Sequence, residues 1–327
     1  MKVCKKIFPT LALFMVASST LAANDPIRMG VVVKIGGIPW FNAMDEGIKK
    51  EAAKQGIDAW MIGPTAADPA LQVRAIEDLI AQKVDVIGVV PNDSKVLEPV
   101  LKKAQDAGIK VIVHESPDQK YADWDFELAE AKGFGESYAQ LLAQCMGEEG
   151  QYAIYVGGLT VPLHNTWADA TINYVKAHYP KMTMVADKFG VAESLDETMR
   201  TTTDLLAKYP ELKGIVAFGS QGPIGAARVV GNQGKQDQTC VLGPFSPGQG
   251  QALVNRGFLK GGYIWNPMTA GEVFVRIGKM TVNGEEIKSG MQIEGMGKIE
   301  IEGRNILGNA LESLDPVNLP KLVELGL

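Results

Sequence analysis

Short apolar segments rich in valine and isoleucine alternate with amphipathic helices along most of the chain. In the first half the expected strands are Ile27–Lys34, Asp58–Ile62, Val86–Val90 and Val111–His114. Strands that are apolar at nearly every position are buried on both faces, which requires helices on both sides of a parallel sheet. This alternation therefore predicts an α/β fold with a doubly wound sheet.

The helices between these strands have one apolar face, as in Pro69–Gln82 and Ser94–Ala107. Asp93 is expected to cap the second of these helices, because its short polar side chain can accept hydrogen bonds from the free N–H groups of the first turn. Gly108 is expected to end the same helix, since glycine readily adopts the left-handed conformation of a helix C-terminus.

The same pattern restarts in the second half of the chain, which predicts two similar lobes. Strands are expected at Tyr152–Gly157, Thr183–Lys188, Gly214–Phe218 and Cys240–Gly243, and helices at Gly133–Met146, His164–His178, Leu195–Tyr209, Ile224–Gly231, Gly248–Asn255 and Met268–Met280. Weaker strand-like segments follow at Met291–Ile293 and Lys298–Ile301. The tail that holds them is expected to cross back between the lobes.

The first residues have the features of a secretory signal peptide. Lys2, Lys5 and Lys6 form a positive region, Ile7–Ala17 is apolar, and Thr20–Ala22 supplies the small residues of a cleavage site. The apolar run is shorter than the roughly 20 residues that a membrane span requires. Cleavage after this segment predicts a free protein in the periplasm or outside the cell, of which the periplasm is the expected location.

This division gives a signal peptide and two lobes, each lobe built from two chain segments. The signal peptide covers residues 1–22, the N-terminal lobe covers 23–127 plus 267–291, and the C-terminal lobe with the tail covers 128–266 plus 292–327. No proline- or serine-rich linker separates the halves, so the connections between the lobes are expected to be short and hinge-like.

Two cysteines, Cys145 and Cys240, remain after such a cleavage. An oxidising compartment permits a disulfide between them. Their spacing matches no recognised disulfide framework, so a disulfide and two buried thiols are both open at this point.

The charge and motif content exclude several function classes. A formal net charge of −6 gives no basic surface for nucleic acid. The chain has 3 histidines and lacks an HExxH motif, a Gly-x-Ser-x-Gly elbow and a phosphate-binding glycine loop. We therefore expect neither catalysis, nor a metal site, nor a cofactor, and the chain is expected to handle small molecules.

Polar and aromatic side chains follow the ends of the expected strands, where parallel sheets bind ligands. A lysine after a buried strand is costly unless it meets water or a partner, and a carboxylate makes strong hydrogen bonds to hydroxyl groups. Aromatic rings can stack on the C–H face of a sugar, or simply fill the core. The candidate ligand-binding residues are Lys34, Trp40, Phe41, His114, Glu115, His164, Asn165, Trp167, Phe218, Ser220, Ser246, Trp265 and Asn266.

Two long segments resemble the type I periplasmic sugar-binding proteins of ABC importers, a ribose-binding-like family. They read IPWFNAMDEGIKKEAAKQGID and QVRAIEDLIAQKVDVIGVVPNDSKVLEPVLKKAQDAGIKVIVHESP. VVVKIGG, GPTAADPALQV and the tail after GMGKIEIEG are similar to the autoinducer-2-binding and rhamnose-binding branch. The resemblance implies two Rossmann-like lobes joined by three crossovers, a monomer that closes on a small carbohydrate and docks with a permease. A receptor coupled to a sensor kinase or chemoreceptor is the alternative.

The resemblance also implies roles for single residues. A lysine at the place of Lys34 holds the ligand in the autoinducer-2-binding proteins, and Glu115 stands where the family has an aspartate. The chain departs from this pattern at Leu163 and His164, where those relatives have an Asp-Gln pair. Ser246 stands where many pentose- and hexose-binding relatives have an aspartate, which argues against an ordinary aldopyranose site. A pentose, a branched sugar, a deoxysugar and a polyol are the ligands that remain.

Overall fold

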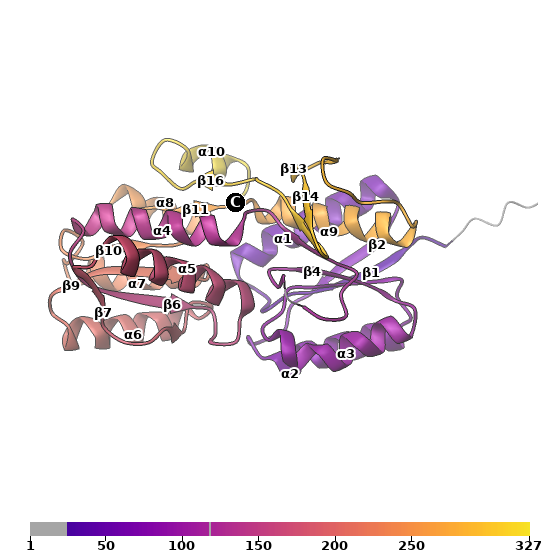
Figure 1. The fold of residues 1–327 in the computed structure, drawn as a ribbon, viewed down its shortest axis with the longest axis horizontal. Coiled ribbons are helices and arrows are strands. Elements are labelled where there is room, and N and C mark those ends of the chain that lie inside the picture. The colour runs from indigo at the N-terminus through magenta and orange to yellow at the C-terminus, as the bar shows by residue number, and fades with distance from the viewer. Residues whose placement is uncertain (1–24, 118) are drawn as a thin grey trace, which may run out of the picture.

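The protein, described by a computed structural model over residues 25–117 and 119–327, consists of two α/β lobes that lie side by side (Figure 1). The expected signal peptide lies outside the described residues. Each lobe has a mainly parallel sheet with helices on both faces, which confirms the predicted fold class. No helix within the described residues is long and apolar enough to cross a membrane.

The sheet of the first lobe has the strand order β14-β15-β5-β4-β3-β1-β2. Its parallel strands are β1 (Arg28–Val32), β2 (Asp58–Ile62), β3 (Val86–Val89), β4 (Lys110–His114) and β5 (Trp124–Glu127). Helices α1 (Pro39–Gln55) and α9 (Pro267–Val282) cover one face, and α2 (Pro69–Ala81) and α3 (Ser94–Asp106) cover the other (Figure 1). Burial on both faces explains why these strands are so uniformly apolar.

The predicted ends of α3 are confirmed. The side chain of Asp93 accepts hydrogen bonds from the N–H groups of Lys95 and Val96. Gly108 follows the helix with a φ of 81°, a conformation that a side chain would strain. The sequence pattern missed β5, because its carboxylates Asp125 and Glu127 interrupt the apolar run although both are buried.

The second lobe repeats the design with the strand order β10-β9-β6-β7. Its strands are β6 (Gly150–Val156), β7 (Met182–Met184), β8 (Phe189–Gly190), β9 (Leu212–Phe218) and β10 (Cys240–Leu242). Its helices are α4 (Ala131–Met146), α5 (Pro162–His178), α6 (Leu195–Lys208), α7 (Gln221–Asn232) and α8 (Pro247–Asn255). The single strand expected over Thr183–Lys188 is instead β7 and β8, which pair with opposite ends of β6.

A disulfide joins Cys145 at the end of α4 to Cys240 at the start of β10, with the two Cα atoms 6.2 Å apart. It closes a segment of 95 residues within the second lobe. Of the two alternatives that the sequence left open, the structure has the disulfide.

The C-terminal tail is divided between the lobes, which corrects the expected assignment of residues 292–327 to the C-terminal lobe. After a small hairpin of β12 (Gln292–Ile293) and β13 (Gly297–Lys298), strands β14 (Glu300–Glu302) and β15 (Asn305–Leu307) extend the first sheet. Strand β15 pairs with β5, which would otherwise be an exposed edge, and Ile306 is fully buried there. Only the last part, with β16 (Glu312–Ser313) and α10 (Leu319–Glu324), packs on the second lobe.

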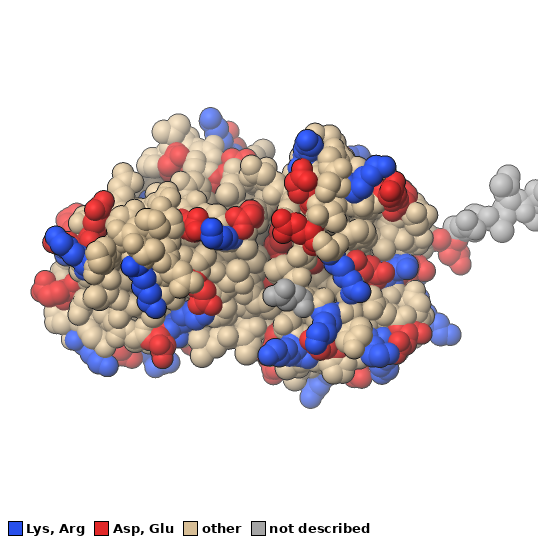
Figure 2. Space-filling view, viewed as in Figure 1, with Lys and Arg blue, Asp and Glu red and all other residues tan. Residues whose placement is uncertain are grey.

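The chain passes between the lobes three times. These connections run from β5 to α4, from β11 (Tyr263–Ile264) to α9, and from β15 to β16. The first and third lie side by side, since the N–H groups of Gly308 and Ala310 donate to the carbonyl oxygens of Glu127 and Leu128. On the face shown in Figure 2, acidic and basic side chains are interspersed over both lobes.

Candidate ligand-binding site

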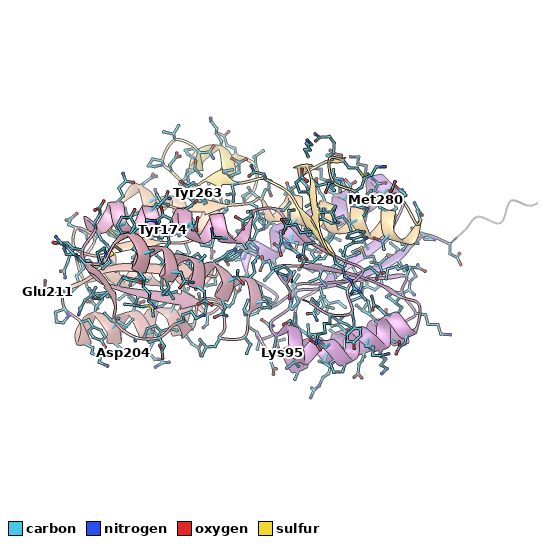
Figure 3. All side chains as sticks on the ribbon, in the orientation of Figure 1. Lys95, Tyr174, Asp204, Glu211, Tyr263 and Met280 are labelled. Atoms are coloured by element: carbon cyan, nitrogen blue, oxygen red, sulfur yellow. A yellow bond between two sulfur atoms is a disulfide. The ribbon has the colours of Figure 1, made fainter. Side chains whose placement is uncertain are left out.

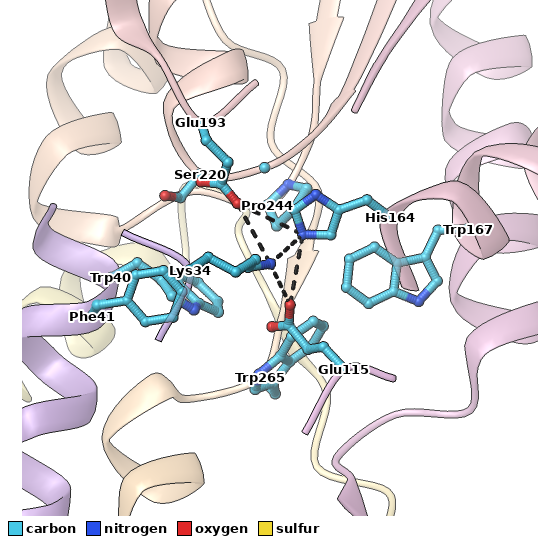
Figure 4. Close-up of a pocket in the computed structure, with 11 residues that line it drawn as sticks. Lys34, Trp40, Phe41, Glu115, His164, Trp167, Glu193, Ser220, Pro244 and Trp265 are labelled. Carbon is cyan, nitrogen blue, oxygen red and sulfur yellow. Dashed lines mark hydrogen bonds and ion pairs between the residues drawn. The ribbon is translucent and has the colours of Figure 1, made fainter. Parts of the chain in front are cut away.

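A cavity lies between the two lobes, and most of its lining residues follow the carboxyl end of a strand (Figure 4). The first lobe contributes Lys34, Trp40, Phe41 and Glu115, and the remaining lining residues are His164, Trp167, Glu193, Gly219, Ser220, Pro244 and Trp265. This is the edge at which parallel sheets bind ligands, and here the edges of two sheets face each other.

A charged cluster occupies the centre of the cavity. The ammonium group of Lys34 is 2.5 Å from the Oε2 atom of Glu115 and 3.4 Å from the Oε1 atom of Glu193. The Nε2 atom of His164 is 2.8 Å from the same ammonium group. Since Lys34 and Glu115 come from the first lobe and Glu193 and His164 from the second, the cluster joins the lobes (Figure 4).

Lys34 and Glu115 are both charged at neutral pH. Burial by itself raises the pKa of Glu115, but the nearby Lys34 ammonium and the His164 hydrogen bond outweigh it and hold that pKa well below its usual range. Burial lowers the pKa of Lys34, and the charges of Glu115 and Glu193 more than compensate, so its pKa is raised.

His164 is neutral and carries its proton on Nε2. Burial and the adjacent Lys34 charge lower the pKa of its imidazole. Its Nδ1 atom accepts a hydrogen bond of 3.1 Å from the N–H group of Gly157, so the single ring proton belongs to Nε2. Two donors, the His164 Nε2–H and the Lys34 ammonium, therefore face each other. A ligand oxygen to one side of this pair could accept a hydrogen bond from both.

Aromatic rings form the apolar walls of the cavity. Trp40 from α1 meets Trp265 edge to face, with ring centroids 5.7 Å apart. Trp167 lies 5.2 Å from Trp265 and stacks against the His164 ring at 5.3 Å. Rigid rings around a charged centre offer a ligand both C–H contacts and oriented hydrogen bonds.

Backbone geometry aims the polar side chains into this space. Glu115 follows β4 with a φ of 64°, a conformation that residues other than glycine adopt only where the surroundings enforce it. At Gly157, an added Cβ atom would lie 2.7 Å from His164 Nδ1 and 2.8 Å from the Cγ atom of Glu193. Glycine at this position allows both side chains to approach the end of β6.

The structure brings most of the predicted residues together in the cavity. The predicted residues that line it are Lys34, Trp40, Phe41, Glu115, His164, Trp167, Ser220 and Trp265. Trp167, for which pocket wall and lobe core were both open, serves as both, since it is also fully buried against Phe134.

Two predicted residues lie in the core instead. The imidazole of His114 stacks flat on Phe126 and its Nδ1 atom bonds the Phe126 carbonyl oxygen at 2.7 Å, so the ring lies behind Glu115 and not in the cavity. Burial lowers the pKa of this imidazole. Phe218 is the last residue of β9 and packs between Tyr138 and Phe134.

Three other predicted residues lie at the beginnings of helices and not in the cavity. The amide of Asn165 donates to the carbonyl oxygens of Gly158 and Val161 at the start of α5. Asn266 caps α9, where its side-chain oxygen accepts two backbone N–H groups. Ser246 is the buried residue that precedes α8. Residues after a strand often begin the next helix, and N-capping explains the position of Asn266.

The sequence analysis missed Glu193, the second carboxylate of the charged cluster. It follows β8, which has only two residues, and it immediately precedes Ser194, the N-cap of α6. A strand this short has no apolar periodicity, so nothing in the local sequence marks Glu193 as the residue beyond a strand end. Among the described residues, no group of three or more histidine, cysteine or acidic side chains is arranged to hold a metal ion.

The buried carboxyl group of Glu127, in β5, makes the stability of the fold depend on pH. Burial and the neighbouring charges of Asp125 and Glu115 raise the pKa of Glu127 well above its ordinary value. A raised pKa in the folded state means that stability is full below the unfolded-state pKa and is lost as the pH rises through the folded-state pKa. Glu127→Gln should therefore raise the melting temperature at pH 8 to 9 but not at pH 4 to 5.

The matched control for this pH prediction is Glu302→Gln, because Glu302 is exposed on β14, the edge strand of the same sheet. Scanning calorimetry from pH 4 to 9 should give a difference between Glu127→Gln and wild type that grows with pH. The control should follow the wild-type curve. Parallel curves for Glu127→Gln and wild type would contradict the assignment of a shifted carboxyl group.

The chain is similar in sequence to several characterised proteins. The sequence profile of the family described as "Periplasmic binding protein domain" matches residues 29–286. The ribose import binding protein RbsB of Bacillus subtilis is 24% identical over 249 residues, which cover 72% of this chain and 79% of that protein. The D-ribose/D-allose-binding protein of Pseudomonas aeruginosa is 26% identical over 230 residues, or 66% of this chain and 70% of that protein.

Solved structures with the same fold include two that contain ligands. An ABC transporter solute-binding protein from Clostridium phytofermentas with bound L-rhamnose superposes with a TM-score of 0.85 at 20% identity, covering 92% of this chain and 99% of that one. LsrB from Clostridium saccharobutylicum in complex with AI-2 has a TM-score of 0.81 at 19% identity, with coverages of 90% and 99%. At these identities the likeness establishes the arrangement of the two lobes.

Proposed function

Because this chain belongs to the periplasmic binding protein family, we propose that it is a transport receptor that closes on a small carbohydrate and delivers it to an ABC permease. The names of the relatives support this proposal, since they bind ribose, allose or L-rhamnose. The same relatives favour import over coupling to a sensor kinase or chemoreceptor. In this proposal the protein works in the periplasm as a monomer and catalyses no reaction.

The observation that carries the proposal is the charged cluster shared by the two lobes. A ligand that touches Lys34 and Glu115 on one side and His164 and Glu193 on the other stabilises the closed arrangement, because only that arrangement makes all contacts. Hydroxyl groups are suitable partners for this cluster. They can donate hydrogen bonds to the carboxylates, and their oxygens can accept hydrogen bonds from Lys34 and His164.

The charges and aromatic rings that line the cavity favour some classes of ligand over others. Lys34, Glu115 and Glu193 together carry a net negative charge, which disfavours sugar acids and sugar phosphates. The indole rings of Trp40 and Trp265 offer flat apolar surfaces to the C–H groups of a sugar. We therefore propose an uncharged pentose, branched sugar, deoxysugar or polyol. AI-2 stays in the test panel because LsrB binds it with the same fold.

A thermal-shift screen tests the function. The panel comprises D-ribose, D-allose, L-rhamnose, D-arabinose, erythritol and AI-2. A ligand at about 1,000 times its Kd should stabilise the wild type by about 4 kcal/mol, which is a shift of several degrees. Glu115→Ala and Trp40→Ala should each lose this shift, because each removes a contact to the ligand.

Glu46→Ala is the control for the screen, since Glu46 is exposed on the same helix as Trp40. It should respond to ligand like the wild type. If Glu115→Ala and Trp40→Ala also respond like the wild type, the ligand binds elsewhere and the proposed site is wrong.

A further inference from the structure

We propose that Thr160 and Asn92 form a latch that holds the two lobes closed and slows the release of the ligand, an inference that rests on the proposed function. The hydroxyl group of Thr160, in the loop between β6 and α5, donates a hydrogen bond of 3.1 Å to the carbonyl oxygen of Asn92, which follows β3. Outside the charged cluster and the three connections, this is the one side-chain hydrogen bond between described residues that joins the two lobes.

The first half of the latch is fixed to the ligand-binding lysine. Asn92 is 3% exposed, and its side-chain amide donates to the carbonyl oxygen of Lys34 at 2.8 Å. Its own N–H group donates to the side-chain oxygen of Gln72, whose amide in turn holds the carbonyl oxygens of Val33 and Val90. The acceptor of the latch is thus rigidly placed relative to Lys34.

The second half of the latch is adjacent to the ligand-binding histidine. Thr160 directly precedes Val161, the N-cap of α5, and His164 lies in the first turn of that helix. The segment of Lys34 and Asn92 on the first lobe therefore faces the segment of Thr160 and His164 on the second. The ion pair of Lys34 with Glu193 and the latch hydrogen bond join the lobes here. Separation of the lobes breaks both contacts together.

The latch bond therefore contributes to the closed form alone. A bond made in one of two states shifts their ratio by its own free energy, and it changes the apparent affinity and the release rate by the same factor. A single partly buried hydrogen bond of this kind corresponds to about a two- to tenfold effect. The latch residues touch no ligand, so they act by positioning the lobes.

Thr160→Val tests the latch, because valine keeps the shape of threonine and removes only the hydroxyl group. Stopped-flow tryptophan fluorescence with L-rhamnose, D-ribose or AI-2, whichever stabilises the wild type, should show release that is about two- to tenfold faster. Thr166→Val is the control, since its hydroxyl group bonds the Pro162 carbonyl oxygen within the same lobe. The control should release the ligand at the wild-type rate. Unchanged release by Thr160→Val, or equal acceleration in both variants, would overturn the latch.

A second measurement keeps the latch separate from the proposed function. If none of the three probes stabilises the wild type, the latch is tested in the ligand-free protein, whereas the proposed function fails only if none of the six ligands of the screen stabilises it. Spin labels at Lys95→Cys and Asp204→Cys, in a Cys4→Ser background, report on the lobes because these exposed residues lie on different lobes, on the side away from α10 (Figure 3). Thr160→Val should shift the distances to longer values, whereas Thr166→Val should not. Identical distributions in Thr160→Val and wild type would overturn the latch.

Discussion

Lys34→Met is expected to abolish ligand binding, with a loss of affinity of more than about 100-fold, and to shift the protein toward an open arrangement of its lobes. Lys34 is the shared cation of two buried carboxylates that come from opposite lobes. Without it, Glu115 and Glu193 face each other across the cavity with no positive charge between them. Isothermal titration calorimetry with the ligand identified by the screen measures the loss.

Lys34→Met should reduce the stability of the fold less than the loss of one partner of an ordinary buried ion pair does. Removal of one partner of such a pair typically destabilises the fold by about 3 to 5 kcal/mol. Here the two carboxylates can regain water by separation of the lobes, so opening limits the effect on unfolding. We expect a modest fall in melting temperature together with a larger radius of gyration in small-angle scattering.

Lys50→Met is the matched control for Lys34→Met. Lys50 is an exposed lysine of α1 that pairs with Glu272, outside the cavity. This variant should keep wild-type affinity and a wild-type radius of gyration. Lys34→Met with near-wild-type affinity would show that the charged cluster does not bind the ligand.

The double variant Cys145→Ser, Cys240→Ala should show the largest loss of stability. A disulfide that closes a segment of 95 residues restricts the unfolded chain. For loops of about 100 residues the expected contribution is about 4 to 5 kcal/mol, which corresponds to a fall in melting temperature of about 10 °C. Neither cysteine lines the cavity, so the Kd for the ligand should stay unchanged.

Reduction provides the control for the disulfide prediction. Wild type treated with dithiothreitol should melt at the temperature of the double variant, and the double variant should not respond to the reductant. A double variant within about 2 °C of the oxidised wild type would contradict a stabilising role for the disulfide.

The sequence predicted the layered α/β architecture because buried parallel strands and one-faced helices leave strong periodic signals. The resemblance carried by the segments around Trp40 and His114 is confirmed by the family match over residues 29–286. The residues that follow long apolar strands, such as Lys34 and Glu115, were found for the same reason. A strand end is easy to locate when the strand itself is long.

The features that the sequence did not reveal depend on contacts between distant segments. Glu193 follows a strand of two residues, and β5 carries two carboxylates, so neither resembles a buried strand. The placement of β14 and β15 in the first sheet depends on the free edge of β5, which only the assembled lobe provides. The sequence placed Asn165, Ser246 and Asn266 at the ligand because a polar side chain after a strand end can serve either a ligand or the start of the next helix, where the structure has these three residues.

The three connections between the lobes determine how they can move. A single connection would act as a swivel and allow rotation about any axis. Three connections, two of them bonded to each other through Gly308 and Ala310, permit bending about one axis and resist twisting. With so few directions of motion available, the open ensemble has little conformational entropy to lose on closure. The tail contributes β15 to the first lobe and α10 to the second, and it thus restricts the direction in which the lobes move. The two halves of the site therefore return to the same relative position each time the lobes close.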